Sequence, residues 1–422
     1  MERRRFLTTS LAASAYALAA PTFAAIPSSH RLRNYNFDGT ISREVLENYL
    51  SRAITMQGLL NGIGNLNDNI RMLKHIGAQY MGRSICLWGG EGNLLANFER
   101  ARRQMPLVRT ASPDAIFEAC IFEIVSTEVE QVPVPDWTFT TFGLPVERRN
   151  FRYEAMLYPP AQRTHSWSEN SGVPDVSQTE TQLWFYFLAK SYIDLGFEGI
   201  HWGQMEIMNF NDPHLDHYGR VFDLVRSYAR RHARRGMVLC NAHTPTWGLV
   251  RNGELLLDFH ALPLRLKEVS DKPQETTLEV GFVDSIYLRS KGGRTYSGWT
   301  CEHLPYLVEL DNWGVAKYPG QPRQTAGRAV KGAYWLWGYD EISWFANQSS
   351  AYRQHWLRYA WDWVRKTDPN GYLEMPGLRG VVSPLNHLTL YAANNPSTAV
   401  PDGFGDENTL YDIWNGEKSN AI

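Results

Sequence analysis

The feature that most constrains the fold of this chain is a repeated order of a short apolar run, a polar turn and a helical pattern. Residues 80–87 form such a run before the helical residues 94–104, and residues 197–206 precede the amphipathic residues 217–234 in the same way. Short, continuous apolar runs that alternate with helices indicate parallel strands buried on both faces. About eight such units predict an α/β protein with a (β/α)8 TIM barrel.

A doubly wound parallel sheet is the alternative fold. Such sheets usually have a glycine-rich turn after the first strand, whereas residues 57–62 read QGLLNG and lack the spacing of a phosphate cradle. We therefore predict the barrel. Its other strands are expected within residues 51–59, 115–125, 236–241, 255–259 and 304–310, and a closing strand within residues 335–345.

Two long insertions interrupt this order, at residues 128–178 and 262–298. Both follow predicted strands, so we expect them to lie over the mouth of the barrel at the carboxyl ends of its strands. Residues 26–422 are predicted to form one domain, in which residues 366–422 are an irregular C-terminal tail packed against the barrel.

The first 25 residues have the pattern of an export signal. Arg3-Arg4-Arg5-Phe6-Leu7 precedes an apolar, alanine-rich stretch and small residues that suit cleavage, which resembles a twin-arginine signal peptide. An ordinary Sec signal is the alternative. Either signal predicts a periplasmic or secreted protein, and no other apolar stretch is long enough to cross a membrane.

Composition narrows the class of partner. The formal net charge is −2, so no basic surplus points to nucleic acid. The chain has 15 Trp and 21 Tyr, which suit either a large core or a groove that stacks on sugar rings. The same aromatic surface would suit a subunit contact, so the oligomeric state stays open. The four cysteines include no C-x-x-C pair, and we expect them to be free thiols: Cys86, Cys120, Cys240 and Cys301.

Two carboxylates stand where predicted strands end. Glu206 follows the apolar run that begins at Phe197, and Glu309 ends the run Tyr306-Leu307-Val308. Active sites of parallel barrels lie at the carboxyl ends of the strands, so these two groups are expected to face each other across the mouth. Cleavage of a glycosidic bond uses such a pair, one as general acid and one as nucleophile or base.

These strand ends resemble those of the clan of retaining glycoside hydrolases with (β/α)8 barrels, which carry catalytic Glu residues on strands four and seven. The resemblance implies that Glu206 is the acid/base, that Glu309 is the nucleophile, and that Trp344 on strand eight lies under the sugar. One position departs from the clan. Met205 stands where the clan usually has Asn before the acid/base, and Gln204 or Asn241 would have to replace that contact.

Other polar and aromatic residues at the predicted strand ends are expected to bind the sugar. They are Trp88, Glu91, Trp202, Gln204, Asn241, His243, Asp258, His260, Asp311 and Trp344. If the strand count is shifted by one, Asp258, Asp340 or Glu341 would replace Glu309 as the second carboxylate.

We thus predict an exported glycoside hydrolase that needs no cofactor and no metal. A metal-dependent barrel hydrolase normally has an H-x-H on its first strand, which is missing here, although His243, Asp258 and His260 could supply ligands. Two further functions would suit the same chain. One is a non-catalytic carbohydrate-binding barrel, and the second is a lyase for acidic polysaccharides that uses the basic loop from Arg289 to Arg294.

Overall fold

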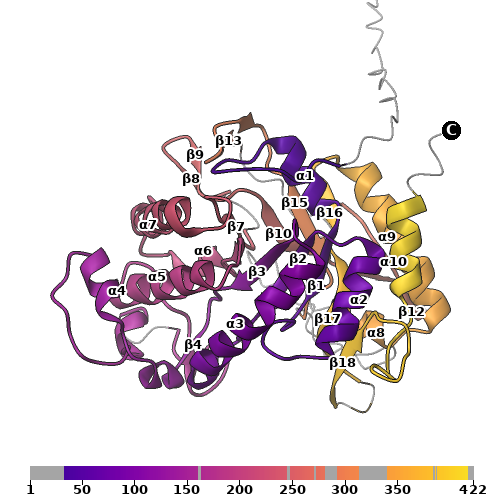
Figure 1. Ribbon diagram of the computed structural model, residues 1–422, viewed down its shortest axis with the longest axis horizontal. Helices are drawn as coiled ribbons and strands as arrows, with labels where there is room; N and C mark the ends of the chain where they lie inside the picture. Colours follow the sequence, from indigo (N-terminus) through magenta and orange to yellow (C-terminus); the bar gives the residue numbers. More distant parts are fainter. Residues whose placement is uncertain are drawn as a thin grey trace, which may run out of the picture.

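The computed structural model describes residues 33–159, 163–244, 248–269, 272–280, 292–312, 340–383, 385 and 387–416. Within these residues the chain is a mixed α/β protein with a mostly parallel central sheet (Figure 1). The predicted signal peptide, the start of the predicted closing strand and the first half of the basic loop lie outside the described residues.

The larger sheet has seven strands. Only the β17–β18 pair is antiparallel, and all other neighbours are parallel, which confirms the parallel strands predicted from the apolar runs. The order is β18 (Leu388–Ala392), β17 (Met375–Val382), β1 (Ala53–Met56), β2 (Tyr80–Ile85), β3 (Ile116–Cys120), β6 (Gly199–His201) and β7 (Leu239–Asn241).

A second, three-stranded parallel sheet contains β10 (His260–Pro263), β15 (Tyr306–Glu309) and β16 (Gly371–Leu373). It adjoins the larger sheet on both sides. The backbone N–H of Asp258 donates to Cys240 O at 2.8 Å, and that of Ala261 donates to Ala242 O at 3.2 Å. On the other side, Glu374 alone separates β16 from β17. The strands are thus two adjoining sheets rather than one continuous sheet.

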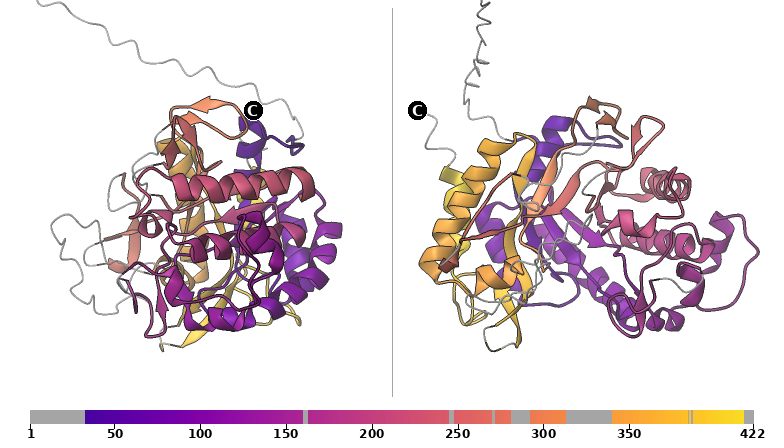
Figure 2. Two further views of the ribbon diagram at one scale, coloured as in Figure 1. Left: turned by 90° about the vertical axis from the view of Figure 1, so that its left-hand side faces the viewer. Right: turned by 180° about the vertical axis from the view of Figure 1, so that it is seen from behind.

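Helices lie along the outside of these strands (Figure 2). Their ends follow from local sequence: the Asn65 side chain accepts the Asp68 N–H at the start of α2, and Gly77 ends α2 with a φ of 76°. None of the helices in the described ranges is long and apolar enough to cross a membrane. The helices of this layer are α2 (Leu66–Ile76), α3 (Leu94–Ala111), α5 (Thr179–Asp194), α7 (Asp216–His232), α9 (Ser350–Thr367) and α10 (Glu407–Gly416). The helix α1 (Arg43–Leu50) lies instead at the amino-terminal ends of the strands, where Leu46 and Tyr49 belong to one apolar cluster with Tyr80, Ile116 and Leu307.

The first insertion covers α5. It packs α4 and η3 against this helix, whose opposite side contacts α7, so α5 is buried on most of its surface. Burial from both sides explains why α5 lacks the clear polar face of α7. The insertion contains α4 (Asp136–Thr141), η3 (Glu154–Met156), β5 (Ser171–Gly172) and most of η2 (Thr127–Gln131), and β4 (Val125–Ser126) directly precedes it.

The region around the second insertion forms a hairpin and a small sheet. The hairpin is β11 (Lys267–Val269) with β12 (Lys272–Thr277). The four-stranded sheet is made of β8 (Val250–Arg251), β9 (Glu254–Leu255), β13 (Gly293–Arg294) and β14 (Thr300–Cys301). All strand pairs in the hairpin and this sheet are antiparallel except β9 with β13. The short elements that follow strands of the two main sheets are η1 (Glu91–Asn93), α6 (Met205–Met208) and α8 (Glu341–Ala346).

Two predicted strands have different bounds in the structure. β6 ends at His201, because Gly203 turns the chain with a φ of 56° and α6 then begins, so Glu206 lies in a helix and not at a strand end. The sixth predicted strand is displaced from residues 255–259 to β10, which places Asp258 before the strand rather than at its carboxyl end.

The predicted end of the fold also differs. Residues 341–346 form α8 instead of a strand, because the Asp340 side chain accepts the Ser343 N–H at 2.9 Å and caps a helix. The place next to β1 is taken by β17, which belongs to the segment predicted to be an irregular tail. The run from Gly371 to Val382 has strand-like alternation, but Pro376 and three glycines concealed it.

Trp344 was predicted to bind the sugar, but the structure places it in the core. Its side chain is fully buried, 5.6 Å from the Trp356 ring and 6.0 Å from the Tyr352 ring. We expect Trp344→Ala to lower the free energy of unfolding by about 3–5 kcal/mol in urea titrations. Leu107→Ala, at a position 54% exposed on α3, is the control and should change it little. An unchanged stability in Trp344→Ala would contradict the core assignment.

Candidate functional site

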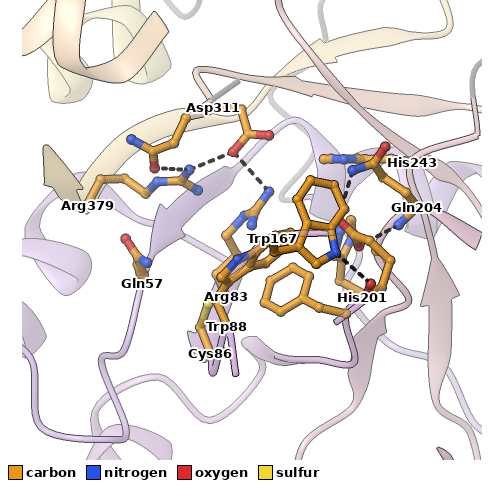
Figure 3. Close-up of a pocket in the computed structure, with 14 residues that line it drawn as sticks. Gln57, Arg83, Cys86, Trp88, Trp167, His201, Gln204, His243, Asp311 and Arg379 are labelled. Carbon is orange, nitrogen blue, oxygen red and sulfur yellow. Dashed lines mark hydrogen bonds and ion pairs between the residues drawn. The ribbon is translucent and has the colours of Figure 1, made fainter. Parts of the chain in front are cut away.

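A cavity of about 470 Å³ lies at the carboxyl ends of the parallel strands. Its lining residues come from or directly follow β1, β2, β3, β6, β7, β15 and β17, and one comes from the first insertion (Figure 3). They are Gln57, Arg83, Cys86, Trp88, Phe122, Glu123, Trp167, His201, Gly203, Gln204, His243, Asp311, Asn312 and Arg379.

One wall of the cavity is aromatic. The Trp88 ring lies 5.1 Å from the Phe122 ring and 5.4 Å from the Trp167 ring, measured between centroids. Trp88 is 48% exposed and Trp167 is 41% exposed, although both are large apolar side chains. The Trp167 indole N–H donates to the backbone oxygen of Glu123 at 3.1 Å and so ties the insertion to the end of β3. This wall offers flat apolar faces to a ligand.

The floor beside the opposite wall is an ion cluster around Glu309. Arg83 contacts both of its carboxylate oxygens, with Nε 3.0 Å from Oε2, while His243 Nε2 lies 3.1 Å from Oε1 and Arg379 Nη1 lies 3.3 Å from Oε2. Burial alone would raise the pKa of Glu309, but Arg83, His243 and Arg379 together hold this pKa well below its usual range. Glu309 is therefore ionised, and both of its oxygens are occupied by protein groups.

Asp311 extends this cluster into the cavity. Arg379 Nη2 lies 2.7 Å from Asp311 Oδ1 and 2.9 Å from the side-chain oxygen of Asn312, and Arg83 Nη2 lies 3.5 Å from the same Asp311 oxygen (Figure 3). Burial raises the pKa of Asp311, but the charges of Arg83 and Arg379 outweigh it and the pKa is lowered. Asp311 is thus an ionised carboxylate that lines the cavity.

Arg83 reaches this cluster through an unusual backbone conformation. Its φ is 56°, within a strand, and the pairing of β2 with β3 shifts register between Met81 and Ile85. Non-glycine residues rarely adopt a positive φ, and such strain is often found at functional sites. The Arg83 N–H donates to Glu118 Oε2 at 3.1 Å, which holds the bulge in place.

A layer of carboxyl groups supports Arg83 from inside the strands. Glu118 also accepts the Tyr80 hydroxyl and the Asn241 side-chain amide, each at 2.5 Å. Burial raises the pKa of Glu118, and burial with the nearby charges of Glu309 and Glu118 raises that of Glu374 well above its usual range. Glu374 packs over Gly82, where a Cβ would lie 2.1 Å from its Oε1. A larger residue at position 82 would therefore require the Glu374 side chain to move.

Glu123 is the cavity carboxylate at the end of β3. Its oxygens accept the backbone N–H of Gln204 at 2.9 Å and the side-chain amide of Gln204 at 2.8 Å. The carboxylate lies against Gly203, where a Cβ would be 2.2 Å from Glu123 Oε2. The glycine that ends β6 therefore also makes room for this group.

Two histidines lie side by side between these carboxylates. The His201 and His243 ring centroids are 4.7 Å apart. His201 Nδ1 is 2.7 Å from the side-chain oxygen of Asn241, so Nδ1 carries the proton and Nε2 carries the lone pair. Burial and the neighbouring His243 lower the pKa of His201 to about 3, which keeps its ring neutral.

The structure brings four of the predicted sugar-binding residues to the cavity: Trp88, Gln204, His243 and Asp311. Asn241 and Glu309 lie directly behind the lining residues, through their bonds to His201 and to Arg83. Glu206 is partly exposed on α6 and is not among the lining residues.

The remaining predicted residues lie elsewhere, and the structure corrects their positions. Trp202 is fully buried, 4.7 Å from the Phe222 ring, and Trp344 is in the core around α9. The others are engaged in local contacts: Glu91 with Ser126, Asp258 with Arg226 and the Cys240 N–H, His260 with Thr244, Asp340 with Ser343, and Glu341 with Arg265.

The lining residues that were missed from the sequence include Arg83, Glu123, Trp167 and Arg379. Arg83 lies within a strand, and Glu123 lies within the apolar run of residues 115–125, where neither resembles a strand end. Trp167 and Arg379 belong to the insertion and to the segment predicted to be a tail. Glu123 had one signal, since it is the carboxylate that interrupts the run after Ile121 and Phe122.

Metal-ligand spacing occurs in the described residues at His243, Glu309 and Asp311, whose nearest ligand atoms lie within 4.8 Å of one another. This set differs from the predicted set of His243, Asp258 and His260. The guanidinium groups of Arg83 and Arg379 contact both carboxylates and already neutralise them. The two carboxylates are therefore better explained as partners of the two arginines than as ligands of a metal cation.

Comparisons with known proteins give weak structural similarity to glycoside hydrolases. No family model and no curated protein matches the sequence. A candidate alpha-amylase from Salmonella typhimurium matches with a TM-score of 0.36 and 10% identity, over 69% of this chain and 52% of that one. A GH36 alpha-galactosidase from Geobacillus stearothermophilus, in complex with 1-deoxygalactonojirimycin, matches with a TM-score of 0.27 and 13% identity, over 47% and 29%.

The chain thus spans about half the length of the first of these structures and less of the second. Both TM-scores are below 0.5, so neither structure identifies the activity of this chain.

The ion cluster should contribute to the free energy of unfolding in a pH-dependent way, and replacing Glu309 should remove this contribution. We expect Glu309→Gln to lower the free energy of unfolding at pH 7 by about 3–5 kcal/mol, because it leaves two buried guanidinium groups short of charge. The pKa of Glu309 is depressed in the folded state, so its contribution is present above the unfolded value of about 4.3 and is lost as pH falls through the folded value. Urea titrations should therefore show the two proteins converging in acid.

Glu99→Gln is the matched control, since Glu99 pairs with Arg102 on the exposed surface of α3. Its effect should be small at every pH. A difference between wild type and Glu309→Gln that stays constant from neutral pH to strong acid would contradict the assignment of an ionised Glu309.

Proposed function

We propose that the chain is an exported glycoside hydrolase whose parallel strands form a (β/α)8 barrel. The barrel is supported by the links between the two sheets. Backbone hydrogen bonds from Asp258 and Ala261 join β10 to β7, and Glu374 continues β16 into β17, which pairs with β1. These links give the described strands a ring of parallel neighbours with their carboxyl ends on one side.

A carbohydrate substrate is supported by the two unlike walls of the cavity. Trp88, Phe122 and Trp167 offer apolar faces that suit the C–H side of a sugar ring. Gln57, Asn312 and the charged groups of the other wall offer hydrogen-bond donors and acceptors that suit its hydroxyl groups.

One observation carries the hydrolytic reaction: Asp311 and Glu123 line one cavity from opposite strands of the proposed barrel. Asp311 follows β15 and Glu123 follows β3, and three strands separate these two in one direction around the ring: β6, β7 and β10. Two carboxyl groups on either side of a sugar are what glycosidic cleavage requires. This pair differs from the pair Glu206 and Glu309 predicted from the sequence.

The environment of Asp311 assigns its role, and Glu123 is left with the complementary one. Asp311 is held ionised by Arg83 and Arg379, so it acts as the nucleophile or as the base that activates water. Glu123 then protonates the leaving oxygen. Glu309 is a positioning residue in this scheme, because it fixes both guanidinium groups from behind the cavity wall.

The proposed carboxylates can be tested on purified protein with a panel of polysaccharides and an assay of new reducing ends. We expect Glu123→Gln and Asp311→Asn each to lower kcat by about 10²–10⁴-fold, since each removes one proton-transfer or nucleophilic group. Trp167→Ala should mainly raise KM. Asp412→Asn, on the exposed surface of α10, is the control and should leave both constants unchanged.

A large loss of kcat in Glu206→Gln with normal turnover in Glu123→Gln would contradict our pair and favour the one predicted from the sequence. Sugar binding by the wild-type protein without any new reducing ends would instead identify a carbohydrate-binding protein. The resemblance to the barrel clan implies retention for the pair Glu206 and Glu309. For Asp311 and Glu123, proton NMR of the first product would show whether the anomeric configuration is retained or inverted.

Export rests on Arg3 and Arg4 of the twin-arginine pattern. We expect the double variant Arg3→Lys, Arg4→Lys to remain in the cytoplasm of a bacterium that exports the wild-type chain, as judged by cell fractionation. Unimpaired export of this variant would point to the Sec route, and retention of the wild-type chain would contradict export.

A further inference from the structure

Two cysteines lie next to each other at the ends of neighbouring strands. Ile85 of β2 is the register partner of Ala119 of β3, so the next residues, Cys86 and Cys120, are neighbours across the same parallel pair. Adjacent strands are about 4.8 Å apart, which is within the Cα–Cα range of disulfides. Both residues also belong to one apolar cluster, together with Phe122.

The two thiols have different surroundings. Cys86 is partly exposed and lines the cavity, whereas Cys120 is buried beneath it. The pKa of the Cys86 thiol is lowered, chiefly by the neighbouring Cys120 thiol and also by the charges of Arg83 and Arg379, against the effect of burial. Burial raises the pKa of Cys120 well above its usual range. Cys86 is thus the more nucleophilic thiol, and Cys120 is placed to resolve its oxidised form.

We propose that Cys86 and Cys120 form a thiol modification site in the cavity wall, which reacts with hydroperoxides and closes to a reversible disulfide. The proposal is independent of the sugar-cleaving reaction. Nothing in the proposed hydrolysis uses a thiol, and the site is built by strand register and by access from the cavity.

The reaction balances with a hydroperoxide as the oxidant. The Cys86 thiolate attacks one peroxide oxygen, which breaks the O–O bond, gives a sulfenic acid and, after proton uptake by the leaving oxygen, releases water. The Cys120 sulfur then attacks the Cys86 sulfur and displaces its hydroxyl, which leaves as a second water with the Cys120 proton. Two thiols and one hydrogen peroxide thus give one disulfide and two waters.

The test is a peptide map of the full-length wild-type protein after treatment with one equivalent of hydrogen peroxide. Trypsin places Cys86 in the peptide of residues 84–100 and Cys120 in that of residues 110–148. We expect these two peptides to be joined, with the loss of two hydrogen atoms in mass, and to separate after dithiothreitol. In Cys120→Ala the link should be absent and dimedone should trap the sulfenic acid on Cys86.

Cys301 is the matched control within the same chain. It is also partly exposed, but burial raises its pKa. Iodoacetamide should therefore label Cys86 several-fold faster than Cys301 at neutral pH. The proposal is overturned if peroxide leaves the two peptides unlinked in the wild-type protein, or if Cys301 is labelled as fast as Cys86.

Discussion

The site depends on one buried carboxylate and the cations around it. Glu309 joins Arg83 of β2, Arg379 of β17 and His243 after β7, which are far apart in the sequence. Such a buried cluster is costly to desolvate, and it persists only when every charge has a partner. Because Arg83 and Arg379 are fixed by Glu309, their remaining N–H groups are aimed at Asp311. The orientation of the cavity carboxylate thus follows from a contact that the ligand never touches.

The same dependence extends beneath the cluster. Arg83 can point toward the cavity because its backbone leaves the regular strand conformation, and Glu118 holds that bulge through the Arg83 N–H. Gly82 leaves the space that Glu374 fills. The guanidinium group of Arg83 is therefore positioned by the strained backbone of β2, by Gly82 and by the buried carboxyl groups of Glu118 and Glu374. A substitution at one of these positions would disturb the others.

The sequence predicted the parallel strands because their burial on both faces produces unbroken apolar runs, and Glu309 does end β15 as expected. The predicted strand ends were wrong where an apolar run continued beyond the strand. The run into Met205 concealed the turn at Gly203, which displaced Glu206 from the strand end. The prediction was also wrong for side-chain direction: Trp202 and Trp88 both follow a strand, yet Trp202 packs on Phe222 and Trp88 lines the cavity. No local pattern separates these two cases, because neighbouring elements decide them.

The cavity is assembled from parts with separate structural origins. Arg83, Asp311 and Arg379 belong to the central strands or follow them directly, whereas Trp167 comes from the long segment after β3 and is tied to it through the Glu123 carbonyl. Changes of length or sequence in that segment would reshape the aromatic wall and leave the ion cluster intact. In proteins with this architecture, the shape of one cavity wall can therefore diverge while the charged wall stays the same.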